Sequence, residues 1–356
     1  SDKQIKRASL IVIEIKTDQL INHLPDPLIT IDSHTEGEIT RLLVSGIGHF
    51  PGDTMVEKLQ YFQLQYDHIR CLLTKEPRGS RGTLTAVCTE SVSPEASFGL
   101  IFMDARRYPH LCGHATIGAV ASLTEIGSLK LDEGQNLVSV DTPSGIMTVR
   151  VTIANKTIVS LALKMVPSFV YQVDQKVQVE GFGEVVLDLV CTGGYFAMVN
   201  TDILGIEPVM KNQKTLTDLG MKIIDAANEQ LIVRHPENPT VNSVDVTKFY
   251  NTETVAGEIR GRGMVIYGES HMDRSPCGTG TAAKLALLRY RNKIRMGQTY
   301  TSISPIGTTF TASIVEETRI GEIEAVVAEI KGRAWITGVH HFYLDKTDPF
   351  SEGYLA

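Results

Sequence analysis

The chain has 356 residues, of which 42% are hydrophobic and 21% are charged, a composition typical of soluble globular proteins. It is long enough for one large or two medium domains, and its composition excludes the disordered, collagen-like and coiled-coil classes. The formal net charge is −7, whereas a surface that binds duplex nucleic acid needs clustered positive charge. We therefore expect no nucleic-acid partner.

The start of the chain contains no apolar stretch that is long enough to span a membrane. Its longest one, residues 8–13, is far shorter than the roughly 20 residues that a spanning helix needs. It also lacks the small-residue cleavage site of a signal peptide. We therefore expect a cytoplasmic protein without a membrane partner.

Short runs rich in β-branched residues recur along the chain and are separated by Gly, Pro, Asn and Asp, which is typical of many strands of modest length. These runs begin at Leu10, Arg41, Phe98, Leu137, Met147, Glu184, Met264 and Ile323. Helical periodicity is confined to residues 54–74, 115–126, 216–234 and 279–294. The sequence predicts a mixed α/β protein with much β-structure.

The five cysteines are widely spaced, with no Cys-x-x-Cys pair and no histidine beside them at zinc-ligand spacing. We therefore expect neither a disulfide scaffold nor a metal site. Cys71, Cys88 and Cys191 lie in apolar or strand-like segments and are expected to be structural, because free cysteines usually behave as small buried hydrophobic residues.

Cys112 and Cys277 begin two segments that match each other. CGHATIGAVASL and CGTGTAAKLALL share Cys, Gly, Thr, Ala and Leu in the same places, and each follows a β-rich run and an irregular stretch. One such cysteine would more often pack in the core, but a matched pair favours a functional role. The long-period repeat predicts two similar lobes with the cysteines in equivalent places.

A thiol at the start of a helix lies near unpaired N–H groups and the positive end of the helix dipole, which should lower its pKa. Gly113 and Gly278 would let the backbone approach a ligand, and the free N–H groups there suit a carboxylate. If two such helix starts face each other across a cleft, one thiolate can remove an α-proton while the other thiol returns a proton to the opposite face. The pattern therefore indicates stereoinversion.

Other functions of the second segment are less well supported. GTGTAA from Gly278 matches a dinucleotide-binding pattern, but no Asp or Glu follows through residue 315 to bind a ribose. The phosphate-loop pattern of nucleotide triphosphatases is absent. Five basic residues in this stretch are expected on a solvated face and helix end rather than at an RNA site: Lys284, Arg289, Arg291, Lys293 and Arg295.

These motifs resemble the proline racemase family, which includes proline racemases, hydroxyproline 2-epimerases and trans-3-hydroxy-L-proline dehydratases. The resemblance runs from about Thr30 to the closing DPFSEGYL and rests on IDSHTEGEITRLLVSG, EPRG, LCGHATIGAV, CTGGYFAMV and MDRSPCGTGTAAKLALL. It implies a diaminopimelate-epimerase-like fold of two pseudo-symmetric α/β lobes with the site in the cleft between them. It also implies a homodimer that uses no pyridoxal phosphate, other cofactor or metal. The implied first lobe comprises residues 30–165 and 339–356, the second residues 166–338, and residues 1–29 are an extension without an assigned role.

The resemblance also implies roles for individual residues. Cys112 and Cys277 correspond to the two acid/base residues, and the loops that hold the substrate carboxylate correspond to Gly113, His114, Gly278 and Thr279. His114 and Asp273 would lie close to the substrate ring nitrogen, where a carboxylate can pair with a secondary ammonium. A turn or helix-capping role is equally open for Asp273.

Two positions differ from those of proline-specific members of the family. Leu84 stands where an aromatic residue is expected, and Tyr267 stands where Phe is common. The Tyr267 hydroxyl needs a hydrogen-bond partner, for which a hydroxyl on the substrate ring, water and backbone are all candidates.

We predict a cofactor-independent racemase or epimerase whose substrate is a small imino acid, proline or 4-hydroxyproline. Dehydration of trans-3-hydroxy-L-proline is the alternative reaction, although Cys277 argues against it because the dehydratases usually carry Thr there. A non-catalytic amino-acid-binding protein is a third possibility, which the presence of both thiols disfavours.

Overall fold

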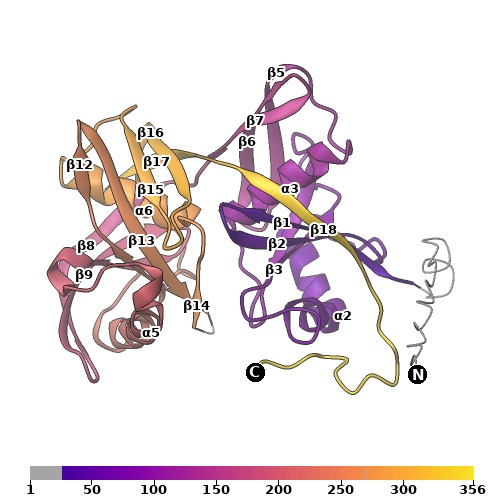
Figure 1. The fold of residues 1–356 in the computed structure, drawn as a ribbon, viewed down its shortest axis with the longest axis horizontal. Helices are drawn as coiled ribbons and strands as arrows, with labels where there is room; N and C mark the ends of the chain where they lie inside the picture. Colours follow the sequence, from indigo (N-terminus) through magenta and orange to yellow (C-terminus); the bar gives the residue numbers. More distant parts are fainter. Residues whose placement is uncertain (1–25, 269) are drawn as a thin grey trace, which may run out of the picture.

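The computed structural model describes residues 26–268 and 270–356, so the β-rich run predicted at Leu10 lies outside the described residues. Figure 1 shows two groups of strands, each with a helix among them. The strands are β1 Leu28–Thr35, β2 Glu38–Ser45, β3 Leu84–Thr89, β4 Phe98–Met103, β5 Gly134–Thr142, β6 Gly145–Ala154, β7 Thr157–Lys164, β8 Ser168–Val179, β9 Gly183–Thr192, β10 Tyr195–Asn200, β11 Val244–Tyr250, β12 Glu253–Val255, β13 Glu258–Tyr267, β14 His271–Met272, β15 Thr299–Ile303, β16 Thr309–Ile320, β17 Ile323–Gly332 and β18 Ala334–Phe342. The helices are α2 Met55–Thr74, α3 Gly113–Glu125, α4 Thr201–Leu204, η1 Met210–Asn212, α5 Gln213–Gln230 and α6 Gly278–Tyr290.

The strands form one hydrogen-bonded network that curls around two centres. In the first group the neighbours run β18–β1–β2–β3–β4–β5–β6–β7. In the second they run β8–β9–β10–β11–β13–β15–β16–β17, and β17 pairs back with β8 to close a barrel. We call β1–β7, α2, α3 and β18 the first lobe, and β8–β17, α4, η1, α5 and α6 the second lobe. β7 also pairs with β17, so the sheet is continuous between the lobes.

Two equivalent helices occupy the centres of the lobes. α3 contacts β1, β2, β7 and β18, whereas α6 contacts β8, β9, β16 and β17. Both have 13 residues, both begin directly after a cysteine, and most of their side chains are buried. The predicted repeat is therefore a repeat of structure, in which each apolar helix is enclosed because it has no polar face to offer to water.

The enclosure of α6 makes the prediction for Lys284 wrong. This side chain was expected on a solvated face, but the residue is only 2% exposed. Its Nζ donates a hydrogen bond of 2.7 Å to Thr252 Oγ1 and lies 3.4 Å from the centroid of the Tyr250 ring. Arg289, in the last turn of the helix, is half-buried. The basic residues beyond the helix are exposed as expected: Arg291, Lys293 and Arg295.

All four predicted helices are present, and α2 and α5 pack on the outside of their lobes. α5 ends at Gln230, four residues earlier than predicted, because Leu231 turns to an extended backbone. α6 ends at Tyr290 because Asn292 adopts a left-handed backbone with φ of 55°, which Asn tolerates. Within residues 26–268 and 270–356, no helix combines the length and apolar character needed to cross a membrane.

The end of the chain returns to the first lobe. β18 pairs with β1 along its whole length, from Leu28 opposite Phe342 to Thr35 opposite Ala334. Beyond β18, Tyr354 bridges to Glu76, and Asp348 forms an ion pair with Arg78. We propose that the first lobe boundary implied by the resemblance, near residue 165, marks a folding unit, and that the second lies at the start of β18, Ala334, rather than near residue 338.

Candidate active site

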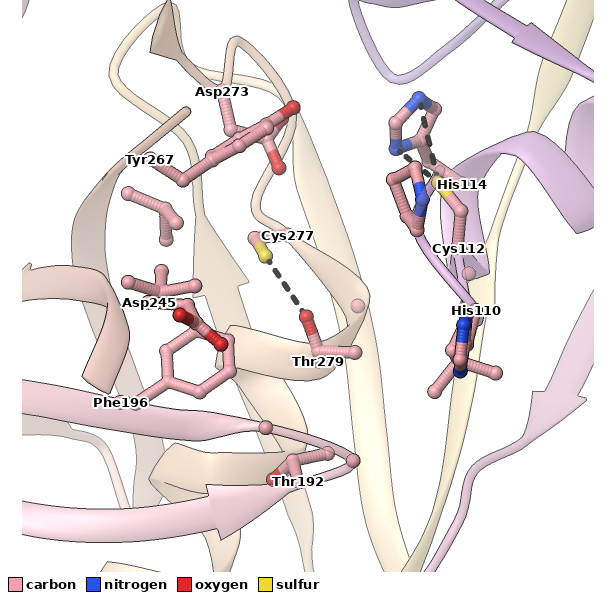
Figure 2. A pocket seen from close by; sticks show the side chains of 18 of the residues that line it. His110, Cys112, His114, Thr192, Phe196, Asp245, Tyr267, Asp273, Cys277 and Thr279 are labelled. Carbon is pink, nitrogen blue, oxygen red and sulfur yellow. Dashed lines mark hydrogen bonds between the residues drawn. The ribbon is translucent and has the colours of Figure 1, made fainter. Parts of the chain in front are cut away.

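A pocket of about 200 Å³ lies between the lobes, and its lining includes every residue that the sequence analysis assigned to the site. Figure 2 shows side chains from the first lobe, including Cys112 and His114, facing side chains from the second, including Cys277 and Asp273. The residues predicted from the sequence are Leu84, Cys112, Gly113, His114, Tyr267, Asp273, Cys277, Gly278 and Thr279. The sequence analysis did not identify the other lining residues, which include Arg107, His110, Ser144, Thr192, Phe196 and Asp245.

The starts of α3 and α6 meet at this pocket. A Cβ placed on Gly113 would lie 3.9 Å from the Cα of Gly278, and a Cβ placed on Gly278 would lie 3.8 Å from the Cα of Gly113. The first N–H groups of a helix have no partner within the helix. Two sets of such donors therefore converge on one small volume, which suits a bound carboxylate.

Cys112 and His114 form a close pair on the first-lobe side. The Cys112 Sγ lies 3.4 Å from Nδ1 and 3.9 Å from Nε2 of the imidazole, which is itself buried. Burial alone would lower the pKa of His114, but negative charge on the Cys112 sulfur, with Asp273 and Glu38 farther away, raises it to about 10. A neighbouring negative charge favours the charged imidazolium over the neutral ring.

The raised pKa of His114 predicts how this histidine titrates. We expect its imidazole to stay protonated at pH 8 in NMR spectra, and its pKa to fall in a Cys112→Ser variant, which lacks the strongest raising influence. Because the folded-state pKa lies above the ordinary 6.5, the stabilisation is fully present below pH 6.5 and is lost as the pH rises through about 10. An unchanged pKa in the variant would contradict the pairing.

Cys277 has a strained backbone at the start of α6. Its φ is 62°, which is uncommon for a residue other than Gly and costs about 1–3 kcal/mol. The conformation is held by the Ser275 hydroxyl, which accepts a 3.0 Å hydrogen bond from the Cys277 N–H. Strain of this kind collects at functional sites, where the surrounding structure fixes it.

The prediction that the helix start lowers the thiol pKa is wrong for Cys277. Burial and Asp273 raise the pKa of this thiol to about 12, against the opposing influences of Lys248, the Thr279 hydroxyl and the Gly280 N–H. The Gly280 N–H does donate to the sulfur, at 3.3 Å, as a helix start should. Removal of a thiolate from water outweighs this hydrogen bond, so Cys277 rests as a thiol.

Asp273 and Tyr267 lie beside Cys277. One carboxylate oxygen of Asp273, Oδ1, accepts hydrogen bonds from the N–H and hydroxyl of Ser275, at 2.8 and 2.7 Å, so the turn role considered from sequence is present. The same residue also lines the pocket, and burial raises its pKa. Burial likewise raises the pKa of Tyr267 well above its ordinary value, so its hydroxyl is a neutral donor or acceptor.

Comparisons with known proteins identify the family of this chain. The chain matches the family model described as proline racemase over residues 30–355. It belongs to the proline racemase family. A proline racemase from Clostridioides difficile is 38% identical over 91% of this chain and 97% of its own, and a 4-hydroxyproline 2-epimerase from Streptosporangium roseum is 35% identical over 91% and 97%. The solved structure of a hydroxyproline epimerase from Agrobacterium vitis with bound trans-4-hydroxy-L-proline is 28% identical, with a TM-score of 0.84 over 93% of this chain and 96% of that one. The predicted fold is thereby confirmed.

Glu38 binds the loop that precedes α6, and the sequence analysis did not identify it. It lies on β2 in the first lobe, and its carboxylate accepts a 2.6 Å hydrogen bond from the backbone N–H of Arg274 in the second. His271 Nε2 lies 3.1 Å from the same carboxylate. Burial alone would raise the pKa of Glu38, but these partners and His114 lower it to about 2. Its only sequence signal is its place in IDSHTEGEIT, one of the segments that resemble the proline racemase family.

The remaining cysteines lie away from this pocket. Cys71 and Cys191 are buried and Cys88 is half-buried, and none of them is among the described residues that line it. The described part of the chain also contains no group of three or more His, Cys, Asp or Glu side chains arranged to hold a metal ion.

Proposed function

We propose that this protein inverts the α-carbon of proline or 4-hydroxyproline without a cofactor, using Cys112 and Cys277 as the two acid/base residues. One observation carries the proposal: the two cysteines begin equivalent helices whose first residues touch, and their sulfurs line one pocket from opposite lobes. Inversion of configuration needs one sulfur on each side of the bound α-carbon, so that a proton leaves from one face and another arrives at the opposite face.

The proposed reaction moves one proton off the substrate and one proton back. The Cys112 thiolate takes the α-proton, and the electron pair of the broken C–H bond is delocalised into the substrate carboxylate. The N–H groups at Gly113, His114, Gly278 and Thr279 stabilise the charge that develops there. The Cys277 thiol then protonates the opposite face of the carbon and becomes a thiolate. The reverse direction exchanges the two roles.

The protonation of two side chains supports this sequence of steps. The raised pKa of His114 places an imidazolium next to the Cys112 sulfur, and the raised pKa of Cys277 keeps a proton on the opposite thiol. Cys277 is thus available as the acid of the first turnover. Asp273 would pair with the secondary ammonium of the imino acid, and Tyr267 and Leu84 would border the ring.

Three finer properties are proposed with the activity. We infer a homodimer, a cytoplasmic location and independence of metals and pyridoxal phosphate. The family resemblance implies the first and third, and a reducing compartment would keep the free thiols reduced. Analytical ultracentrifugation tests the first of these, fractionation of cells that make the protein natively tests the second, and activity after exhaustive chelation tests the third.

Isotope exchange tests the reaction itself. The reduced protein in D₂O should introduce deuterium at the α-carbon of L-proline or trans-4-hydroxy-L-proline, as followed by NMR, while the optical rotation falls or changes. The faster of the two substrates identifies the physiological class. Absence of both exchange and inversion with either imino acid, after full thiol reduction, would refute the proposal.

The same assay separates the alternatives. A dehydratase would turn over trans-3-hydroxy-L-proline faster than it exchanges the α-proton of either other substrate, with a cyclic imine as the product that a coupled reductase detects. A binding protein would release heat on adding proline in calorimetry but leave the α-proton in place.

A further inference from the structure

Lys248 is a buried lysine near the pocket whose ammonium has no hydrogen-bond partner among the described residues. Lys248, on β11, is 1% exposed, and its Nζ forms no hydrogen bond with any described residue. Burial of an ammonium without a partner is costly. The contrast with Lys284 is direct, since that ammonium has the Thr252 hydroxyl and the Tyr250 ring. The stability of the fold gives no reason to bury the Lys248 ammonium at this position without a hydrogen-bond partner.

The Lys248 ammonium and the Cys277 sulfur lie on either side of Gly280. A Cβ placed on Gly280 would be 3.2 Å from the Cys277 Sγ and also 3.2 Å from the Lys248 Nζ. The two atoms therefore border the space at Gly280 that a side chain would fill, in the first turn of α6. Lys248 is not among the described residues that line the pocket, so it approaches the sulfur from behind.

The charges around this pair are few. The groups that act electrostatically on Cys277 are Asp273 from the preceding loop, Lys248 from β11, and the Thr279 hydroxyl and Gly280 N–H from α6, while Tyr267 on β13 faces the same sulfur. Burial lowers the pKa of Lys248 to about 8, although Cys277 and Asp273 oppose this shift. Lys284 also interacts electrostatically with Lys248, and no described carboxylate forms an ion pair with Lys248.

We propose that Lys248 is a positioning residue whose ammonium stabilises the thiolate of Cys277 from behind the pocket. The inference rests on the proposed function, in which Cys277 exchanges a proton with the substrate. When the Cys277 thiol gives its proton to the α-carbon, the sulfur becomes negative in a buried place. The Lys248 ammonium compensates that charge without contacting the substrate. Gly280 leaves the space through which the two charges interact.

Site-resolved alkylation tests this role without relying on turnover. We would label the ligand-free full chain with iodoacetamide at pH 7 and follow Cys277 and Cys112 separately by mass spectrometry. In K248M, Cys277 should react at least about tenfold more slowly, because each pKa unit changes the thiolate fraction tenfold. K248R should restore most of the rate. Labelling of Cys112 serves as the internal control, and K284M, which removes the satisfied lysine, should not slow the labelling of Cys277.

Each outcome decides the inference. Equal labelling of Cys277 in K248M and the unmodified protein would overturn it, as would an equal slowing in K284M. K248M should fold, because replacing a buried charge by an apolar side chain is often neutral or stabilising, and thermal unfolding checks this. Isotope exchange measured in parallel separates the two proposals: failure of the unmodified protein to exchange refutes the function, whereas exchange with unaltered K248M labelling refutes only the role of Lys248.

Discussion

Replacing Cys277 or Cys112 by Ser should lower the rate of inversion by about 10²–10⁴-fold, the usual contribution of a positioned acid or base. A serine hydroxyl is too weakly acidic to replace a thiolate without separate activation. The cysteine that remains should still abstract a proton from the enantiomer it faces. Each single variant should therefore keep some elimination of a leaving group from the ring carbon next to the α-carbon, with opposite enantiomer preference.

Chiral chromatography and NMR of the eliminated product measure both effects. Cys88→Ser is the matched control, because this cysteine is half-buried like Cys112 but does not line the pocket. Its turnover should stay close to that of the unmodified protein. Near-normal inversion by Cys277→Ser, or α-proton exchange by the double variant, would rule out the two-thiol mechanism.

The second large effect is expected at Glu38, where Glu38→Gln should lower the free energy of unfolding by roughly 1.5–3 kcal/mol, the value of hydrogen bonds to a charged group. The substitution leaves His271 and Arg274 without the carboxylate that they share. It should also slow turnover, because Glu38 holds the backbone N–H of Arg274 and hence the loop that carries Asp273 and Cys277. Displacement of a catalytic group by 1 Å can cost about 10²-fold in rate.

The pH dependence distinguishes this role from general destabilisation. The pKa of Glu38 falls from an ordinary 4.5 to about 2 on folding, so its stabilisation is present above pH 4.5 and is lost as the pH falls towards 2. Denaturant titrations of the unmodified protein and the variant should therefore converge across this range. Glu36→Gln, in the same turn, is the control: burial raises the pKa of Glu36, so its removal should not produce this convergence. Parallel curves for Glu38→Gln and the unmodified protein would contradict the assignment.

Cys112 and Cys277 have a local signature, because each precedes a glycine and an apolar helix, and the repeat of that pattern predicted two equivalent helix starts. The family resemblance, not a local signature, assigned Leu84, Tyr267 and Asp273 to the site. Glu38 had no such signature, because its partner Arg274 is 236 residues away. Lys284 was misplaced because a basic residue in a helix usually faces water, and only the closure of the second-lobe barrel around α6 shows otherwise.

The value of a thiol pKa could not be predicted from a motif either. A helix start favours the thiolate, and the Gly280 N–H does bind the Cys277 sulfur. The decisive quantity is how far the sulfur is removed from water, which depends on residues from β11, β13 and the loop before α6. Such long-range burial is a property of the assembled fold rather than of any segment.

The pairing of β18 with β1 has a consequence for the order of events during synthesis. β1 leaves the ribosome long before β18, the neighbour that comes from residues 334–342. The nascent first lobe must therefore wait with an open edge until almost the whole second lobe has emerged, and open edges invite pairing with other chains. β17, which closes the second-lobe barrel against β8, ends at Gly332, and β18 begins at Ala334. The two lobes should therefore close at nearly the same time, once the end of the chain has left the ribosome.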